Sequence, residues 1–133
     1  MIAVQEGRTG EESRLAVSDD LEQLYARAHE LADLGGATAV LGWDQETMMP
    51  RKGGEARAWQ LSTLQGIYHE RLTDPKVGEI LDGLASATGS ELGDVDRALI
   101  RELRRDYDRA VKLPNRLVRQ LAEATSRGVE VWR

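Results

Sequence analysis

Apolar residues recur at steps of three and four along most of the chain, and this spacing most constrains the fold. Leu21, Leu24, Ala28 and Leu31 show the step early, and it continues as far as Trp132. Each residue of an α-helix turns by about 100°, so such steps collect side chains on one face, whereas a strand needs strict alternation. No convincing hairpin signal interrupts the pattern. The sequence therefore predicts an all-α fold of about six helices, arranged as antiparallel helical hairpins or a bundle.

Capping residues, glycines and prolines predict the helix boundaries. Asp19 can cap a first helix that reaches Leu34, and Gly35 and Gly36 then weaken it before a mostly buried segment that ends at Trp43. Further helices are expected from about Glu55 to Leu72, from Pro75 to Leu84, from Asp94 to Lys112, and from Pro114 onwards, with a polar loop over Ala85 to Gly93. Asp74 can cap the helix that Pro75 begins. The inward-facing residues are expected to include Val77, Ile80, Leu81 and Leu84 in the fourth helix and Leu117, Val118, Leu121, Thr125, Gly128 and Trp132 in the last.

The two ends of the chain differ from its middle. Residues 1–17 mix Gly, Glu, Ser and Arg without a clear period, so they are expected to form a flexible leader before a helical region over 18–133. In the last helix, Gly128 is expected to mark a close helix approach. The apolar Trp132 is followed by Arg133, and not by a Gly, Asn or Pro that would end the helix. The sequence therefore predicts a truncated chain.

Composition limits the classes of function. The 18 Lys and Arg against 23 Asp and Glu give a net charge of −5, and no basic stripe is present, so we expect no nucleic-acid partner. Cysteine is absent, which removes disulfides and thiolate zinc sites and fits a cytoplasmic, reducing compartment. No segment resembles a signal peptide or approaches the ~20 apolar residues of a membrane span, so no membrane partner is expected.

Histidines are the first candidates for a metal site, and the chain has only His29 and His69. His69 and Glu70 begin an H-E-x-x-H pattern, in which two histidines one helical turn apart hold zinc. The second histidine would have to occupy position 73, which is Thr73. We therefore predict no catalytic residue, no metal ligand and no bound cofactor in this chain, with His29 solvated and His69 on the surface.

The most distinctive segment is GWDQETMMP at residues 42–50, where polar groups follow an apolar run directly. One interpretation is that Asp44, Gln45 or Glu46 faces a ligand groove. The alternative is that Trp43 belongs to the core and the acids orient a neighbouring arginine or cap a helix. Asp44 and Glu46 lie two residues apart and would not share a helical face, so a two-carboxylate acid and base pair is disfavoured.

This segment, from Leu34 through Pro50, resembles the N-terminal signature of the carboxypeptidase Taq family of zinc metallocarboxypeptidases. Three further motifs occur in the family's order, so the resemblance extends over about Leu21 to Arg133. They are Gly54-Glu55-Ala56-Arg57 with Gln60-Leu61, Leu72-Thr73-Asp74-Pro75 with Val77-Gly78, and Leu113-Pro114 through Trp132.

The resemblance implies a larger, mostly helical enzyme, often a homodimer, that removes C-terminal amino acids from peptides with zinc. Its zinc ligands lie on an H-E-x-x-H helix, which this chain lacks, so the chain is expected to end before the zinc-binding part and to be inactive alone. The resemblance gives Trp43, Asp44 and Gln45 a role in the substrate groove or directly behind it.

Two hypotheses follow. The first is the N-terminal fragment of such a metallocarboxypeptidase, forming a wall or lid of its peptide groove. The alternative is a stand-alone, non-enzymatic helical module derived from the family, which interacts or self-associates through the apolar seam of its last helix.

Overall fold

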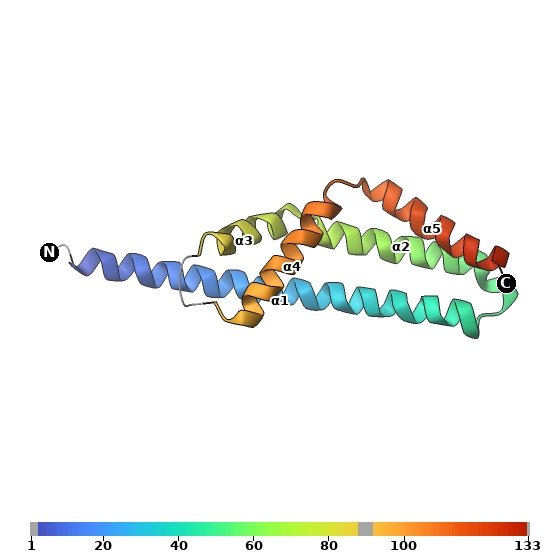
Figure 1. Cartoon of the computed structure of the whole chain (residues 1–133), viewed down its shortest axis with the longest axis horizontal. Helices are drawn as coiled ribbons and strands as arrows, with labels where there is room; N and C mark the ends of the chain where they lie inside the picture. The colour runs from blue at the N-terminus through green and yellow to red at the C-terminus, as the bar shows by residue number, and fades with distance from the viewer. Residues whose placement is uncertain (1–2, 88–91, 133) are drawn as a thin grey trace.

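The computed structural model describes the backbone of residues 3–87 and 92–132, and the side chains of residues 10–87 and 92–132. Within these residues the chain forms five α-helices and one short 3-10 helix, which confirms the predicted all-α fold. They are α1 (Ala3–Thr47), η1 (Arg51–Gly53), α2 (Gly54–Leu72), α3 (Pro75–Ala85), α4 (Asp94–Ala110) and α5 (Asn115–Trp132). The long α1 extends along most of the molecule, and α2 and α5 lie over its C-terminal half (Figure 1).

The first helix differs most from the sequence prediction. α1 is one continuous helix of 45 residues, in place of an irregular leader and two shorter segments. No proline occurs before Pro50, and a glycine within a helix costs only about 1 kcal/mol relative to alanine. Contacts with α3 and with α2 stabilise the helix at successive levels, so Gly35 and Gly36 do not end it. Asp19 caps nothing and accepts a hydrogen bond from Gln23 Nε2 inside the helix (2.8 Å).

The turn between α1 and α2 is held by backbone hydrogen bonds and by a buried methionine. The backbone N–H groups of Met48 and Met49 both donate to the Asp44 carbonyl oxygen (3.0 and 2.9 Å), and the Met49 side chain is buried. Pro50 cannot continue the helical hydrogen-bond ladder, so the chain reverses through η1. α2 then returns antiparallel to α1 (Figure 1).

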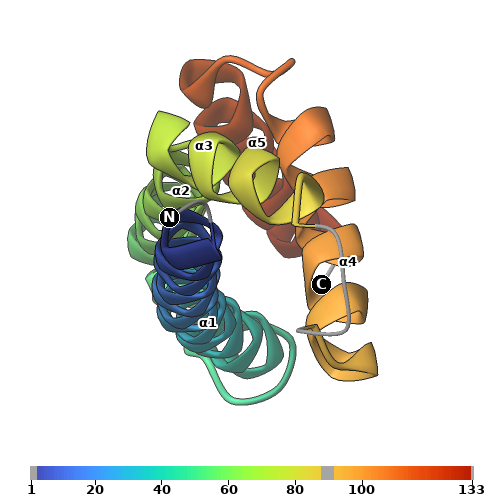
Figure 2. The same ribbon diagram turned by 90° about the vertical axis from the view of Figure 1, so that its left-hand side faces the viewer.

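An apolar cluster joins α1, α3 and α4. Asp74 caps α3 by accepting from the Lys76 backbone N–H (3.0 Å), with Pro75 in the first turn, as predicted. The predicted inward residues of α3 are confirmed as buried, and together with Leu24 of α1 they form the cluster Leu24, Val77, Ile80, Leu81 and Leu84. Leu99, Ile100, Leu103 and Tyr107 of α4 cover it. Figure 2 shows α3 extending from the α1 side of the molecule towards α4.

The connection into α4 is partly described. The predicted polar loop includes residues 88–91, which lie outside the described residues. α4 begins at the predicted Asp94, and the Asp96 carboxylate accepts the Gly93 backbone N–H (2.8 Å), which satisfies a free donor at the start of the helix.

α5 packs on α2 along a row of small residues. Gly54, Ala58, Ser62 and Gly66 recur at every fourth position of α2, and all are buried. A Cβ at Gly66 would lie 2.5 Å from Arg119 Nε, and one at Gly54 would lie 2.8 Å from Glu130 Cγ. Side chains of α5 therefore occupy the space that larger residues on α2 would need, so the helices can approach closely.

Two predictions about α5 are wrong. The predicted seam does not form its buried face, because Leu121 and Trp132 are 55% and 92% exposed while Ser126 is buried. Gly128 does not mark a close approach, since a Cβ there would meet no atom within 4 Å. The row of small residues on α2 instead receives the long polar side chains of Arg119 and Glu130.

Candidate functional site

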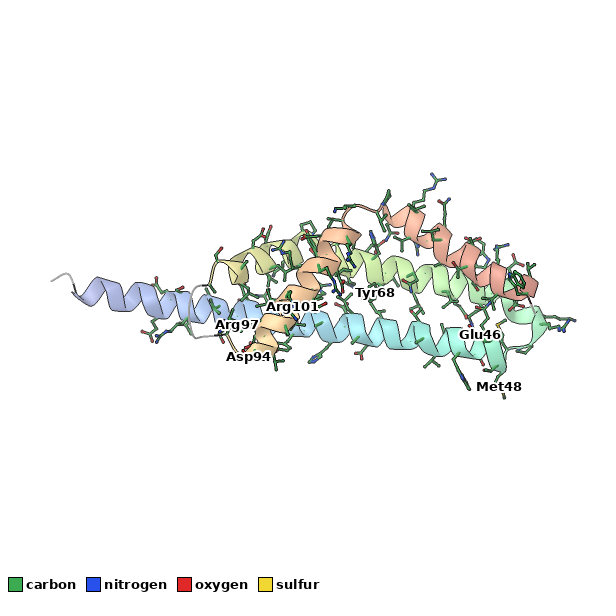
Figure 3. All side chains as sticks on the ribbon, in the orientation of Figure 1. Glu46, Met48, Tyr68, Asp94, Arg97 and Arg101 are labelled. Atoms are coloured by element: carbon green, nitrogen blue, oxygen red, sulfur yellow. The ribbon has the colours of Figure 1, made fainter. Side chains whose placement is uncertain are left out.

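A groove lies between α1 and α5 over α2, with a volume of about 490 Å³. It is mostly apolar, and Glu46 is the charged residue in its lining; Figure 3 labels Glu46 near the C-terminal end of α1. We call it the α1–α2–α5 groove. Its lining residues are Thr38, Gly42, Gln45 and Glu46 of α1, Leu61 and Gln65 of α2, and Leu113, Val118, Leu121, Ala122, Thr125, Ser126 and Val129 in or just before α5.

Gln45 connects the two walls of this groove. Its side chain is only 2% exposed. Its Nε2 donates to the Ser126 carbonyl oxygen (2.9 Å) and to Glu130 Oε1 (3.3 Å), while Ser126 Oγ donates to Gln45 Oε1 (3.1 Å). The amide and the hydroxyl therefore satisfy each other away from water, where an unpaired polar group is costly. Gln45 therefore lies in the wall of the α1–α2–α5 groove, where its hydrogen bonds position α5.

Asp44 has a different partner. Arg57 Nη2 donates to Asp44 Oδ2 (2.7 Å), and Arg57 Nη1 donates to the Leu41 carbonyl oxygen. The pair ties the end of α1 to the first turns of α2. Asp44 therefore orients a neighbouring arginine, as the alternative interpretation of residues 42–50 predicted.

Trp43 lies on the other side of α1. It stands two residues before Gln45, which is about 200° around the helix axis. Its side chain is 62% exposed, so the interpretation of Trp43 as a core residue is wrong for this chain. The structure therefore places Asp44 and Gln45 against neighbouring helices and leaves Trp43 in a position to contact another molecule or another part of a larger protein.

His69 is buried, and its predicted surface position is wrong. His69 Nε2 lies 3.0 Å from the Ala110 carbonyl oxygen, and Nδ1 lies 3.4 Å from Asn115 Nδ2. A carbonyl oxygen only accepts, so Nε2 carries the proton. Asn115 Nδ2 also donates to the Gly66 carbonyl oxygen (2.8 Å). His69 thus holds the turn between α4 and α5 on α2, a role that residue spacing along one helix could not reveal.

These residues do not fit a zinc site. Both ring nitrogens of His69 face other partners, and His29 is exposed on α1 beside Tyr25. Across residues 10–87 and 92–132, no three His, Asp or Glu side chains converge into a group that could hold a metal ion. No step of a zinc mechanism can therefore be assigned to described residues.

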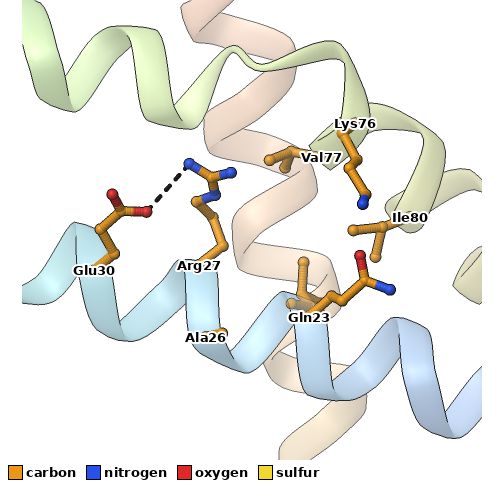
Figure 4. A pocket seen from close by; sticks show the side chains of 8 residues that line it. Gln23, Ala26, Arg27, Glu30, Lys76, Val77 and Ile80 are labelled. Atoms are coloured by element: carbon orange, nitrogen blue, oxygen red, sulfur yellow. Dashed lines mark hydrogen bonds and ion pairs between the residues drawn. The ribbon is translucent and has the colours of Figure 1, made fainter.

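A smaller cavity of about 230 Å³ lies between α1 and α3 (Figure 4). Its apolar floor belongs to the cluster described above, and its rim carries Gln23, Arg27, Glu30 and Lys76. Arg27 Nη1 pairs with Glu30 Oε2 and Arg27 Nη2 with Asp74 Oδ2, both at 3.2 Å. These ion pairs join α1 to the start of α3, so the rim of the cavity contributes to packing.

Tyr25 and Asp96 link α1 to α4. The Tyr25 hydroxyl donates to Asp96 Oδ1 (2.7 Å). This hydrogen bond, together with the Gly93 backbone N–H on the other oxygen, holds the pKa of Asp96 below its usual range. The same bond to the carboxylate raises the pKa of the Tyr25 hydroxyl.

Sequence reasoning missed Ser126, Leu61 and Gln65 as members of the groove. Ser126 lies one position beyond the predicted seam, and its exact pairing with Gln45 depends on how α5 rotates about its axis. One signal was available, because small residues at every fourth position of α2 indicate the face on which another helix packs closely.

Every helix in the described part of the chain is too short or too polar to cross a bilayer.

Comparison with known proteins gives the family. The profile described as carboxypeptidase Taq (M32) metallopeptidase matches residues 23–133. The chain is 39% identical over 112 residues to thermostable carboxypeptidase 1 of Thermus thermophilus, a match that covers 84% of this chain and 22% of that protein. It is 30% identical over 116 residues to thermostable carboxypeptidase 1 of Pyrococcus furiosus, covering 86% and 23%. No solved structure gives a significant match.

The chain therefore belongs to the carboxypeptidase Taq (M32) family of metallopeptidases, and the resemblance noted from its motifs is confirmed. It spans about a fifth of the length of the curated relatives that it matches.

Proposed function

We propose that this chain is the N-terminal helical region of a zinc-dependent metallocarboxypeptidase that releases C-terminal amino acids from peptides. The observation that carries the proposal is the family match over residues 23–133, together with 39% identity to a thermostable carboxypeptidase. The donor groups described here do not fit zinc. The metal and the groups that act on the peptide bond therefore belong to other parts of the enzyme, and the chain alone is inactive.

Within that enzyme, the end of α1 forms part of the wall or lid of the peptide groove. Trp43 is a large aromatic side chain that is exposed to solvent. Aromatic residues bury much area at little cost in conformational entropy when they contact a ligand. Asp44 and Gln45 support it from behind, because their contacts with Arg57 and Ser126 fix α1 against α2 and α5. The absence of cysteine fits a cytoplasmic location for this enzyme.

Two measurements test whether the chain is inactive alone. The purified chain is assayed for release of C-terminal amino acids from peptides and analysed for metal content. We expect no turnover and no stoichiometric zinc. One tightly held zinc per chain, or turnover that a chelator abolishes, would contradict the proposal.

A chimera tests the groove role. The whole chain replaces the matched segment of thermostable carboxypeptidase 1 from Thermus thermophilus, and peptide hydrolysis is measured. We expect an active chimera in which Trp43→Ala raises KM more than it lowers kcat, since the lost contact serves binding. Trp59→Ala, at another exposed tryptophan, is the control. Unchanged KM in Trp43→Ala would remove Trp43 from the peptide groove.

A second candidate function is a non-enzymatic module that self-associates. The observation in its favour is the exposed apolar seam of α5, with Leu121 and Trp132 in contact with solvent. Light scattering distinguishes the two: a stable dimer that Leu121→Asp converts to a monomer supports the module, whereas a monomer at all concentrations contradicts it.

A further inference from the structure

The α1–α2–α5 groove is a mostly apolar concavity bordered by three helices, and its shape suits a helix. The lining within α5 runs from Val118 to Val129, which is about 17 Å, or three turns, at the rise of an α-helix. Figure 1 shows α1 and α5 running in one direction and α2 in the other. Three helices in this up-and-down arrangement leave one side of a four-helix bundle open, and bundles close that side with a fourth helix.

We propose that an amphipathic helix from the rest of the family-length enzyme fills this groove and completes a four-helix bundle. The inference rests on the proposed function and goes beyond it by naming the surface and the kind of segment that covers it. The segment shared with this chain makes up 22% and 23% of the two matched relatives, so an enzyme of that length has polypeptide to supply the helix.

The lining determines the chemistry of the helix. Leu61, Val118, Leu121 and Val129 present aliphatic surface, so the docking face must carry apolar residues at steps of three and four. Glu46 favours a Lys or Arg opposite the α1 wall. Because the chain itself is acidic, with a net charge of −5, a basic partner segment fits better than a second copy of the chain.

The test compares one substitution in two settings. In the isolated chain Leu121 is 55% exposed, so Leu121→Asp is expected to leave the melting temperature almost unchanged. In the chimera described above, the same substitution would bury a carboxylate against the docked helix, and we expect the melting temperature to fall by about 2–5 °C, since the shift per unit of destabilisation shrinks as the chain lengthens. Leu121→Ala is the milder variant and should lower it by a smaller amount in the chimera only.

Leu15→Asp is the matched control. Leu15 is similarly exposed but lies on α1 before residue 23, where the family match begins, so it should be silent in both settings. If the unmodified chimera does not fold, a binding experiment with two separate polypeptides replaces it. The isolated chain is mixed with the part of the Thermus enzyme that follows the matched segment, and binding between them is measured. Binding that Leu121→Asp weakens tenfold or more then supports the inference.

Two outcomes would overturn the inference. The first is an active chimera in which Leu121→Asp leaves the melting temperature unchanged, or unimpaired binding by Leu121→Asp in the experiment with separate polypeptides. The second is an isolated chain that dimerises through Leu121, since the groove then takes a second copy. An inactive but folded chimera that still loses stability on Leu121→Asp contradicts the proposed function and leaves the docking surface supported.

Discussion

The two ends of this molecule are held together by different interactions. Where α1, α3 and α4 meet, Leu24, Leu81 and Leu84 are almost wholly buried in one apolar cluster. Where α2 packs against α1 and α5, the buried residues include the polar Gln45, Ser62 and Ser126 beside small residues of α2, and the bulky Leu121 remains exposed. The first end is closed by apolar burial, whereas the second is specified by close approach and hydrogen bonds and remains open along the groove. The open end is the one that we propose is covered by a further helix.

The largest effect should come from the closed end. Leu81→Ala removes a fully buried side chain from the cluster, and such truncations cost about 2–5 kcal/mol of unfolding free energy. Urea denaturation followed by circular dichroism measures it, with Leu15→Ala as an exposed control expected to stay within about 0.5 kcal/mol. A small loss at Leu81 would show that the cluster does not dominate stability.

At the open end, Gln45→Ala should cost about 1–3 kcal/mol because it leaves the buried Ser126 hydroxyl without its partner. The exposed Gln120→Ala is the control. A double-mutant cycle with Ser126→Ala measures the coupling directly in the same denaturation assay. Strictly additive losses would mean that the two side chains stabilise α5 independently.

Glycine-to-alanine substitutions should change the free energy of unfolding differently at the two ends. A Cβ at Gly78 would lie 2.9 Å from the ring carbon Cζ of Tyr107, so Gly78→Ala should destabilise by about 1–3 kcal/mol. At Gly66 the obstruction is the flexible Arg119 side chain, and Gly66→Ala should cost less. Gly128 meets nothing, so Gly128→Ala should stabilise by about 1 kcal/mol through helix propensity. Equal losses at Gly78 and Gly66 would show that both ends are packed with the same rigidity.

The smallest effect concerns pH. The lowered pKa of Asp96 means that its contribution is present above the ordinary carboxyl range and is lost as pH falls through the folded pKa. The raised pKa of Tyr25 means that its contribution is present below about pH 10 and is lost as pH rises through its folded value. The stability difference between the wild type and Tyr25→Phe should therefore be flat near neutral pH and shrink at both extremes. A difference that stays constant at pH 3 would contradict the Tyr25–Asp96 bond.

The fold was largely predictable because helical periodicity is a local property. The start of α3 followed from Asp74 and Pro75, and its buried residues from their spacing, since a cap and a stripe of side chains depend on neighbours within a few positions. The sequence did not predict that α1 continues through Gly35 and Gly36, because contacts with α2 and α3 outweigh the weak local preference of glycine against helix.

The candidate site was predictable only in part. The segment at residues 42–50 marked the right end of α1, yet its three candidate side chains point to different surroundings: Trp43 to solvent, Asp44 to Arg57 and Gln45 to Ser126. Helical geometry separates neighbouring residues around the axis, but it does not say what each of them meets.

By itself, the sequence determined the all-α class, most helix boundaries and the family, because caps, periodicity and short motifs each depend on residues that are close together in the sequence. Tertiary structure alone decided that His69 is buried, that Ser126 rather than Leu121 is buried and pairs with Gln45, and that a groove stays open between α1 and α5. These features depend on the rotation and separation of helices distant in the chain. The row of small residues on α2 and the hydrogen bonds between Gln45 and Ser126 fix the rotation of α5, and neither depends on neighbours in the sequence.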